Sequence, residues 1–409
     1  MNKSLLCLLC TMVFALAACQ QPDDDSPRVV LCIPVYGQSL ALGEEAERLT
    51  DFDSLATYAD GRIVTERLDH RFGYFDNKPW KLWLKRLLHD QGQSFELSLY
   101  EMARQLADAT GPDTIVCIFP GGQGATPLRK LSKGTLPYRH FIETIQTAHD
   151  AAAARGWQFV VPAICWMQGE SDICDYPDTD YQQLLTQILR DFNADILPVT
   201  RQTDSIPFIV YQPNSLTRAP RFHAASHHCP ETAVPQTFVR LLQHDHRFWA
   251  SGPTYPYTCV NHKIHIDARG QQAIGALAAQ SLLTMLRGGQ HCQGLIPLSV
   301  HAADRQVVVR MNVPVSPLTI DTLQVSPVSH YGFSVVNRQG ADITDHVTLQ
   351  GDSVVIRCLS SVAGCRVRYA VNGEPMKSGR QHGPRGNLRD AQGHWCYQFD
   401  MPCDSILGM

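Results

Sequence analysis

Three short stretches of the sequence place hydroxyl, amide and carboxylate side chains beside glycine. They read GQSL around Ser39, GGQGAT from Gly121 to Thr126, and QGESD from Gln168 to Asp172, and each follows an apolar run. A serine hydroxyl is a poor nucleophile at neutral pH, so it needs a base within reach and donors for the oxyanion formed on attack. The stretches indicate acyl transfer with Ser39 as nucleophile, whereas each alone is also explained as a polar turn that ends a strand.

The base has to be chosen among 17 histidines, and position favours His265. It lies in NHKIHIDARGQQAIGALAAQSLLTML, directly before a long amphipathic stretch whose first turn Asp267 or a neighbour is expected to cap. A loop at that place can reach the edge of a sheet. The alternative for a histidine in front of a helix is capping or simple surface exposure.

Short apolar runs alternate with helix-like stretches between Val29 and about Gly288. The pattern predicts strands over 29–35, 114–120, 158–168 and 207–213, and helices over 97–110, 140–156 and 180–196. Such alternation is typical of a parallel sheet with helices on both faces, in which ligands bind beyond the carboxyl ends of the strands. The three polar stretches should therefore meet at one edge of the sheet.

Four stretches of the sequence, GQSL, GGQGAT, WMQGESD and HIDARGQQAIG, resemble those of the SGNH hydrolases in their order and approximate spacing. They are most similar to the sialate O-acetylesterase and acetylxylan esterase branch. The resemblance covers roughly residues 29–288, and its third stretch is the most specific. It implies a flavodoxin-like three-layer α/β/α fold and the removal of O-acetyl groups from a carbohydrate through an acyl-enzyme.

Carried over to this chain, the resemblance implies that Ser39 is the nucleophile and His265 the general base. The oxyanion hole would combine the backbone N–H of Ser39, a backbone N–H from Gly121 or, preferably, Gly122, and the side-chain amide of Gln168. One such donor contributes about 3 kcal/mol of transition-state stabilisation.

Two positions depart from the family pattern. Leu40 stands where the branch usually has asparagine, and His262 stands three residues before His265, where the family has aspartate. The acid that fixes the imidazole tautomer is thus missing. Either a Ser-His dyad operates with a backbone carbonyl orienting the ring, or another carboxylate substitutes. Glu170 is the nearest candidate; its other interpretation is that it ties the third loop to the first.

The first eighteen residues read as a targeting segment, with Lys3 before the apolar run LLCLLCTMVFALAA. The run ends in LAAC, which looks like a bacterial lipobox and predicts lipidation at Cys19, followed by a polar tether over 19–28. The alternative is an ordinary secretory signal. The residue after Cys19 is Gln20, whereas an aspartate at this position commonly retains bacterial lipoproteins at the inner membrane. We therefore expect an exported lipoprotein of the outer membrane.

Residues 29–289 are thus expected to form the SGNH esterase domain. After about residue 290 the pattern changes to alternating apolar and polar residues, which predicts an all-β sandwich-like domain over 292–409. A net charge of −4 gives no basic surface for nucleic acid. Because HExxH and paired CxxC spacings are absent, we expect no metal and no cofactor. The resemblance implies an acetylated glycan as partner. Two other functions stay open, namely a noncatalytic glycan-binding surface lipoprotein and an esterase acting on non-sugar esters.

Overall fold

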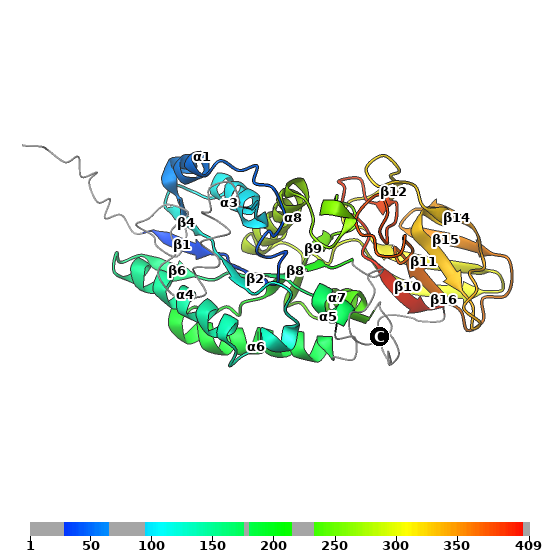
Figure 1. The fold of residues 1–409 in the computed structure, drawn as a ribbon, viewed down its shortest axis with the longest axis horizontal. Coiled ribbons are helices and arrows are strands. Elements are labelled where there is room, and N and C mark those ends of the chain that lie inside the picture. Colours follow the sequence, from blue (N-terminus) through cyan, green and yellow to red (C-terminus); the bar gives the residue numbers. More distant parts are fainter. Residues whose placement is uncertain (1–27, 65–94, 176–179, 215–232, 404–409) are drawn as a thin grey trace, which may run out of the picture.

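A parallel sheet forms the centre of the first two thirds of the chain (Figure 1). The computed structural model describes residues 28–64, 95–175, 180–214 and 233–403. The strands of this sheet are β1 Val29–Cys32, β2 Val35–Gly37, β3 Ile63–Val64, β4 Thr114–Cys117, β5 Pro120–Gly122, β6 Gln158–Val160, β7 Ile164–Met167, β8 Phe208–Gln212 and β9 Phe248–Pro253. Their hydrogen-bonded orders are β3-β4-β1-β6 and β5-β2-β7-β8-β9.

These two groups of strands continue one another. Only Ile33 and Pro34 separate β1 from β2, and the ladder persists there, because Ile33 N–H donates to Cys117 O at 2.8 Å and Val35 N–H to Phe119 O at 3.1 Å. Leaving the two-residue β3 aside, the strand order is the 2-1-3-4-5 of flavodoxin-like sheets. Ligands in such sheets bind outside the carboxyl ends of the strands where the order reverses, which here means beside β2 and β7.

Helices cover both faces of this sheet. Helices α3 Ser98–Ala109 and α8 Ala268–Leu286 pack together on one side, and α4 Leu136–Ala153 and α6 Tyr181–Thr200 pack together on the other (Figure 1). Shorter helices complete the layers: α1 Phe52–Thr57, α5 Glu170–Asp175 and α7 Ala233–His244. The three-layer α/β/α fold expected from the sequence is therefore confirmed.

Local sequence explains several element boundaries. Asp267 caps α8, since its carboxylate accepts a 2.8 Å hydrogen bond from Gly270 N–H. The strand expected over 29–35 is interrupted at Pro34, which lacks the N–H that the ladder needs. Helix α4 begins four residues earlier than the expected 140, because Pro137 fits the first turn of a helix.

The last third of the chain contains antiparallel sheets. One has the order β10-β11-β15-β14 and another β13-β16-β18, with β12 and β17 paired beside them. The strands are β10 Ile296–Ala303, β11 Gln306–Asn312, β12 Thr319–Ile320, β13 Phe333–Val336, β14 Thr344–Gln350, β15 Ser353–Cys358, β16 Arg366–Tyr369, β17 Leu388–Arg389 and β18 Phe399–Pro402. Burial alternates along β11, as the sequence pattern predicts for half-buried strands.

Reciprocal hydrogen bonds attach these sheets to the parallel one. Gln212 Nε2 donates to Gln398 O at 2.9 Å, and Gln398 N–H donates to Gln212 Oε1 at 2.7 Å. Both glutamines are fully buried, so the two parts of the chain share a continuous interior.

The targeting segment and Cys19 lie outside the described residues, so export and lipidation stay predictions. Among the residues that the structure does describe, none of the helices is both long and apolar enough to cross a membrane.

Candidate active site

Ser39 lies in the turn that follows β2, at the carboxyl edge of the sheet. A hydrogen bond to the end of β7 fixes this turn, because Gln38 N–H donates to Met167 O at 3.0 Å. Gly37 allows this approach: a Cβ there would lie 1.9 Å from Met167 O, which no side chain tolerates. The carbonyl of Ser39 accepts hydrogen bonds from Leu42 N–H at 3.1 Å and Glu44 N–H at 3.0 Å. The backbone around the predicted nucleophile is thus fixed on both sides.

A cavity of about 400 Å³ opens beside this turn. It brings Ser39 together with His265, which lies 226 positions further along the chain, so the expected pairing of these two residues in one site is seen. The first, second and third polar stretches contribute Ser39, Ala125 and Ser171 respectively. The full lining comprises Gln38, Ser39, Glu44, Glu45, Ala125, Ser171, Lys263, Ile264, His265, Met376 and Ser378.

The imidazole of His265 is flanked by two consecutive carboxylates. Its Nδ1 lies 2.6 Å from Glu45 Oε2, and its Nε2 lies 3.8 Å from Glu44 Oε2. The loop that carries the ring is fixed as well, since Val260 N–H donates to His265 O at 2.8 Å. Both glutamates come from the turn after β2, so one segment supplies the predicted nucleophile and the acids that surround the predicted base.

The electrostatics of the two glutamates differ. Partial burial raises the pKa of Glu44, which the neighbouring Glu45 raises further, although the nearby His265 lowers it. Glu44 is consequently easier to protonate than an ordinary glutamate in water. The side chain of Glu45 is 44% exposed.

Glu170, the carboxylate expected from the sequence to orient His265, is placed elsewhere. The hydroxyl of Tyr211 lies 2.6 Å from each of its carboxylate oxygens, and Glu170 is 1% exposed. Burial and the adjacent carboxylate raise the pKa of the Tyr211 phenol well above its usual value, so the phenol stays protonated and donates. The carboxylate at His265 is Glu45, which corrects the expectation for Glu170.

Gln168 also differs from its expected role as an oxyanion donor. Its Nε2 donates to Asp172 Oδ2 at 2.5 Å and to Thr126 O at 3.2 Å, which uses both amide hydrogens. Its Oε1 accepts from the Tyr181 hydroxyl at 2.9 Å. The side chain is fully buried and does not line the cavity. Gln168 therefore joins the second and third loops to α6, because a side chain with both hydrogens committed has none for an oxyanion.

The backbone N–H groups expected to form the oxyanion hole differ in their positions relative to the cavity. Neither Gly121 nor Gly122 lines the cavity, where their stretch is represented by Ala125 instead. The Ser39 backbone N–H has no acceptor among the residues that the structure describes, although Ser39 is only 4% exposed. Since Ser39 lines the cavity, this N–H is the donor best placed for an oxyanion.

The antiparallel region completes the cavity, a contribution that sequence reasoning missed. Met376 and Ser378 lie on its wall. Ser378 N–H donates to His262 O at 2.8 Å, and Arg380 N–H donates to Tyr257 O at 3.0 Å. His262, found where the family has aspartate, thus anchors this wall through its carbonyl.

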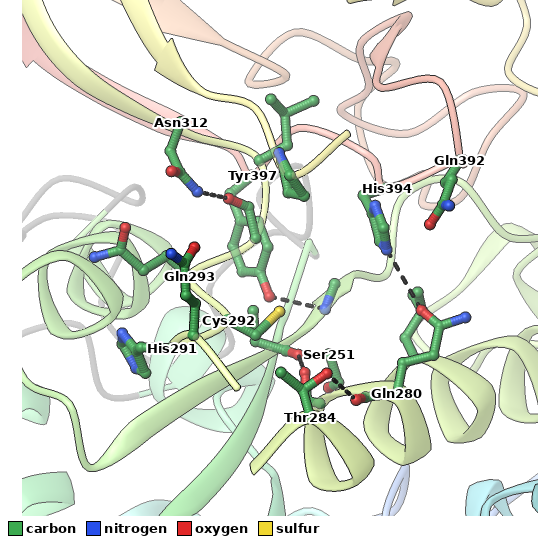
Figure 2. A pocket seen from close by; sticks show the side chains of 18 of the residues that line it. Ser251, Gln280, Thr284, His291, Cys292, Gln293, Asn312, Gln392, His394 and Tyr397 are labelled. Atoms are coloured by element: carbon green, nitrogen blue, oxygen red, sulfur yellow. Dashed lines mark hydrogen bonds between the residues drawn. The ribbon is translucent and has the colours of Figure 1, made fainter. Parts of the chain in front are cut away.

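A second and larger cavity, of about 590 Å³, lies between α8, β9 and the antiparallel region (Figure 2). Its lining mixes apolar side chains with neutral polar ones, among them Gln280, Gln293, Asn312 and Tyr397. Figure 2 shows His394 directed toward Gln280. His394 Nε2 lies 3.4 Å from Gln280 Oε1. The predicted nucleophile and base do not line this cavity. Within the described segments, no group of three or more His, Cys, Asp or Glu residues is arranged to hold a metal ion.

Comparison with known proteins agrees with the resemblance seen in the sequence. Residues 89–284 match the family described as carbohydrate esterase, sialic acid-specific acetylesterase. No protein with a curated description matches the sequence. The family match confirms the resemblance to the sialate O-acetylesterase branch and supports a carbohydrate acetylesterase activity.

Three solved structures are similar to this chain at low sequence identity, and the first of them has a TM-score above 0.5. A carbohydrate acetylesterase from Xanthomonas citri superposes with a TM-score of 0.60 at 15% identity, covering 90% of this chain and 80% of its own. A protein from Arabidopsis thaliana has a TM-score of 0.45 at 15% identity, covering 63% and 98% of the two chains. NanS has a TM-score of 0.44 at 14% identity, covering 64% and 99%. The first likeness extends into the antiparallel region, because residues 29–289 alone do not reach such coverage.

Proposed function

We propose that this chain is a serine esterase that removes O-acetyl groups from carbohydrates through an acyl-enzyme. The observation that carries the proposal is the shared cavity of Ser39 and His265 at the carboxyl edge of the parallel sheet. The family match supports the carbohydrate acetyl ester as substrate class. The serine mechanism rests on the site geometry and on the motif resemblance.

In the first half of the reaction, Ser39 Oγ attacks the acetyl carbonyl carbon while its proton passes to His265 Nε2. The ester C–O bond then breaks, the sugar hydroxyl leaves with that proton, and the acetyl group stays on Ser39. Water attacks the acyl-enzyme with the same histidine as base, which releases acetate and restores the hydroxyl. No hydrogen bond joins Ser39 to His265 in this structure; such contacts often form only in the complex with substrate.

The developing oxyanion needs donors, and the backbone N–H of Ser39 is the first of them. It is preorganised by the hydrogen bonds that fix the turn after β2, in a residue that lines the cavity. A donor of this kind contributes about 3 kcal/mol to the barrier reduction, because it is already oriented when charge develops.

Hydrolysis of a simple aryl acetate tests the proposal. We expect Ser39→Ala to lower kcat by at least about 10³-fold, His265→Ala to do the same, and the double variant to lose little more, since the two residues act as a unit. Ser205→Ala is the matched control, because Ser205 is exposed in the loop before β8, at the opposite edge of the sheet, and should keep the wild-type rate. Equal background rates for wild type and Ser39→Ala would refute catalysis and favour a noncatalytic glycan-binding protein.

Acetylated sialic acid, acetylated xylan and acetylated rhamnogalacturonan, assayed beside the aryl acetate, separate a carbohydrate esterase from one that acts on non-sugar esters. Acetate release from none of the three glycans, with full activity on the aryl ester, would contradict the carbohydrate substrate. We also propose export and membrane attachment through Cys19, on the sequence alone, which fractionation of cells producing the full chain tests.

A further inference from the structure

Three features compete for the orienting role at His265. The family position is occupied by His262, whose carbonyl accepts from Ser378 N–H and whose ring lies 4.6 Å from that of His382. Glu170 contacts Tyr211 instead. Of the described side chains, only Glu45 has a carboxylate bonded to His265 Nδ1. The acid therefore has to be sought in the turn after β2.

The backbone on both sides of Glu45 is held in place. Before it, the turn is closed by Glu44 N–H donating to Ser39 O. After it, Ala46 O accepts from Glu96 N–H at 2.9 Å, and the carboxylate of Glu96 accepts from Thr50 N–H at 2.8 Å. Glu45 itself has a φ of 64°, a left-handed backbone conformation that is unfavourable for glutamate. Such strain in a fixed turn is frequent at functional sites.

The groups that surround the imidazole can be assigned by their sides. Glu45 lies at Nδ1, whereas Glu44 lies nearer Nε2, at 3.8 Å. Lys263, from the same loop as His265, also lines the cavity. A carboxylate at Nδ1 holds the proton there, so that Nε2 is the unprotonated nitrogen and can accept the proton of a serine hydroxyl. Once Nε2 is protonated, the same carboxylate stabilises the positive ring.

We propose that Glu45, from the segment that carries the nucleophile, is the positioning carboxylate of His265. It replaces an aspartate from the histidine loop. This proposal rests on the esterase function proposed above. It makes Ser39, Glu45 and His265 a triad in which two members lie six residues apart, in a turn closed by hydrogen bonds to the carbonyl of Ser39.

Glu45→Gln tests the proposal because it keeps the shape of the side chain and removes its charge. We expect kcat on an aryl acetate to fall by about 10- to 100-fold, less than for a fully buried acid, since water screens a carboxylate that is 44% exposed. The acid limb of the kcat/KM profile should move to lower pH by up to about one unit, because the protonated ring loses its stabilising charge. Glu45→Asp should recover part of both effects.

Two glutamates serve as comparisons. Glu47→Gln makes the same chemical change two positions further along, at an exposed side chain that does not line the cavity, and should keep the wild-type rate and profile. Glu170→Gln should leave the acid limb in place. The melting temperature of Glu45→Gln should match that of Glu47→Gln, which separates loss of chemistry from loss of fold.

The outcomes distinguish this proposal from the function on which it rests. A wild-type rate and profile in Glu45→Gln, with Ser39→Ala inactive, would overturn the role of Glu45 and leave the esterase intact. A shifted acid limb in Glu170→Gln and not in Glu45→Gln would assign the orienting role to Glu170 instead. Undiminished activity in Ser39→Ala would remove the proposed function itself.

Discussion

Truncation of Gln168 distinguishes a catalytic donor from a structural one. As an oxyanion donor, Gln168 would cost about 10²- to 10³-fold in kcat when changed to alanine, without loss of stability. The structure predicts the reverse, because both amide hydrogens are bonded to Asp172 and Thr126 and the side chain is fully buried. Gln168→Ala should unfold more easily and, while folded, lose less than about tenfold in kcat.

The magnitude follows from the bonds that are lost. The hydrogen bond to the Asp172 carboxylate is worth about 1.5 to 3 kcal/mol, and the one to the Thr126 carbonyl about 1 kcal/mol. The Tyr181 hydroxyl, which bonds Oε1, keeps the backbone carbonyl of residue 168 as its acceptor, so its loss of Oε1 adds little. Truncation also leaves a void in a close-packed interior, which adds on the order of 1 kcal/mol. The free energy of unfolding should therefore fall by about 3 to 5 kcal/mol. For a domain of this size the melting temperature should drop by on the order of 10 °C.

Urea unfolding and steady-state kinetics, measured at a temperature where the variant is fully folded, provide the assay. Gln168→Met is the matched variant, since it preserves most of the volume and removes the same donors. It should be less destabilised than Gln168→Ala by roughly the void contribution. Wild-type stability in both variants together with a 10²- to 10³-fold loss of kcat would refute the structural interpretation and restore Gln168 to the oxyanion hole.

Two further predictions concern β5, the strand paired with β2, and the response of stability to acid. Gly122→Ala should lower the free energy of unfolding in urea by about 3 kcal/mol or more, because φ is +108° and the new Cβ would lie 1.9 Å from Gly37 O. Gly134→Ala is the control: its φ is +91° and the space around it is open, so only the backbone strain should lower its stability. An equal loss of stability in the two variants would contradict the steric argument. Burial alone would raise the pKa of Asp390, but hydrogen bonds from the side chain and backbone of His394 outweigh the burial and lower this pKa. The ionised Asp390 therefore stabilises the fold at pH values above the ordinary aspartate pKa, and this stabilisation is lost as the pH falls through the lowered pKa. Asp390→Asn should be less stable than wild type at pH 7 but lose less stability between about pH 5 and pH 2, and equal slopes in the two proteins would contradict this assignment.

The elements of the parallel-sheet region could be predicted because their causes are local. Parallel strands such as β8 are apolar on both faces and read as continuous apolar runs. The burial of Leu99, Met102 and Leu106 on α3 follows from helical spacing, and the cap of α8 follows from Asp267. Strand breaks at proline were missed, because a run of apolar residues conceals the loss of one backbone donor.

The sequence by itself determined that Ser39 and His265 belong to one site, since motif order and the parallel topology place both at the same edge of the sheet. Tertiary structure alone decided which side chains serve them. Gln168 donates to Asp172 because the hydrogens of a buried amide need acceptors. Glu45, in a left-handed backbone conformation, contacts the imidazole of His265, which lies 220 residues away in the chain. Such choices depend on distances between segments remote in the chain, which no local pattern of residues encodes.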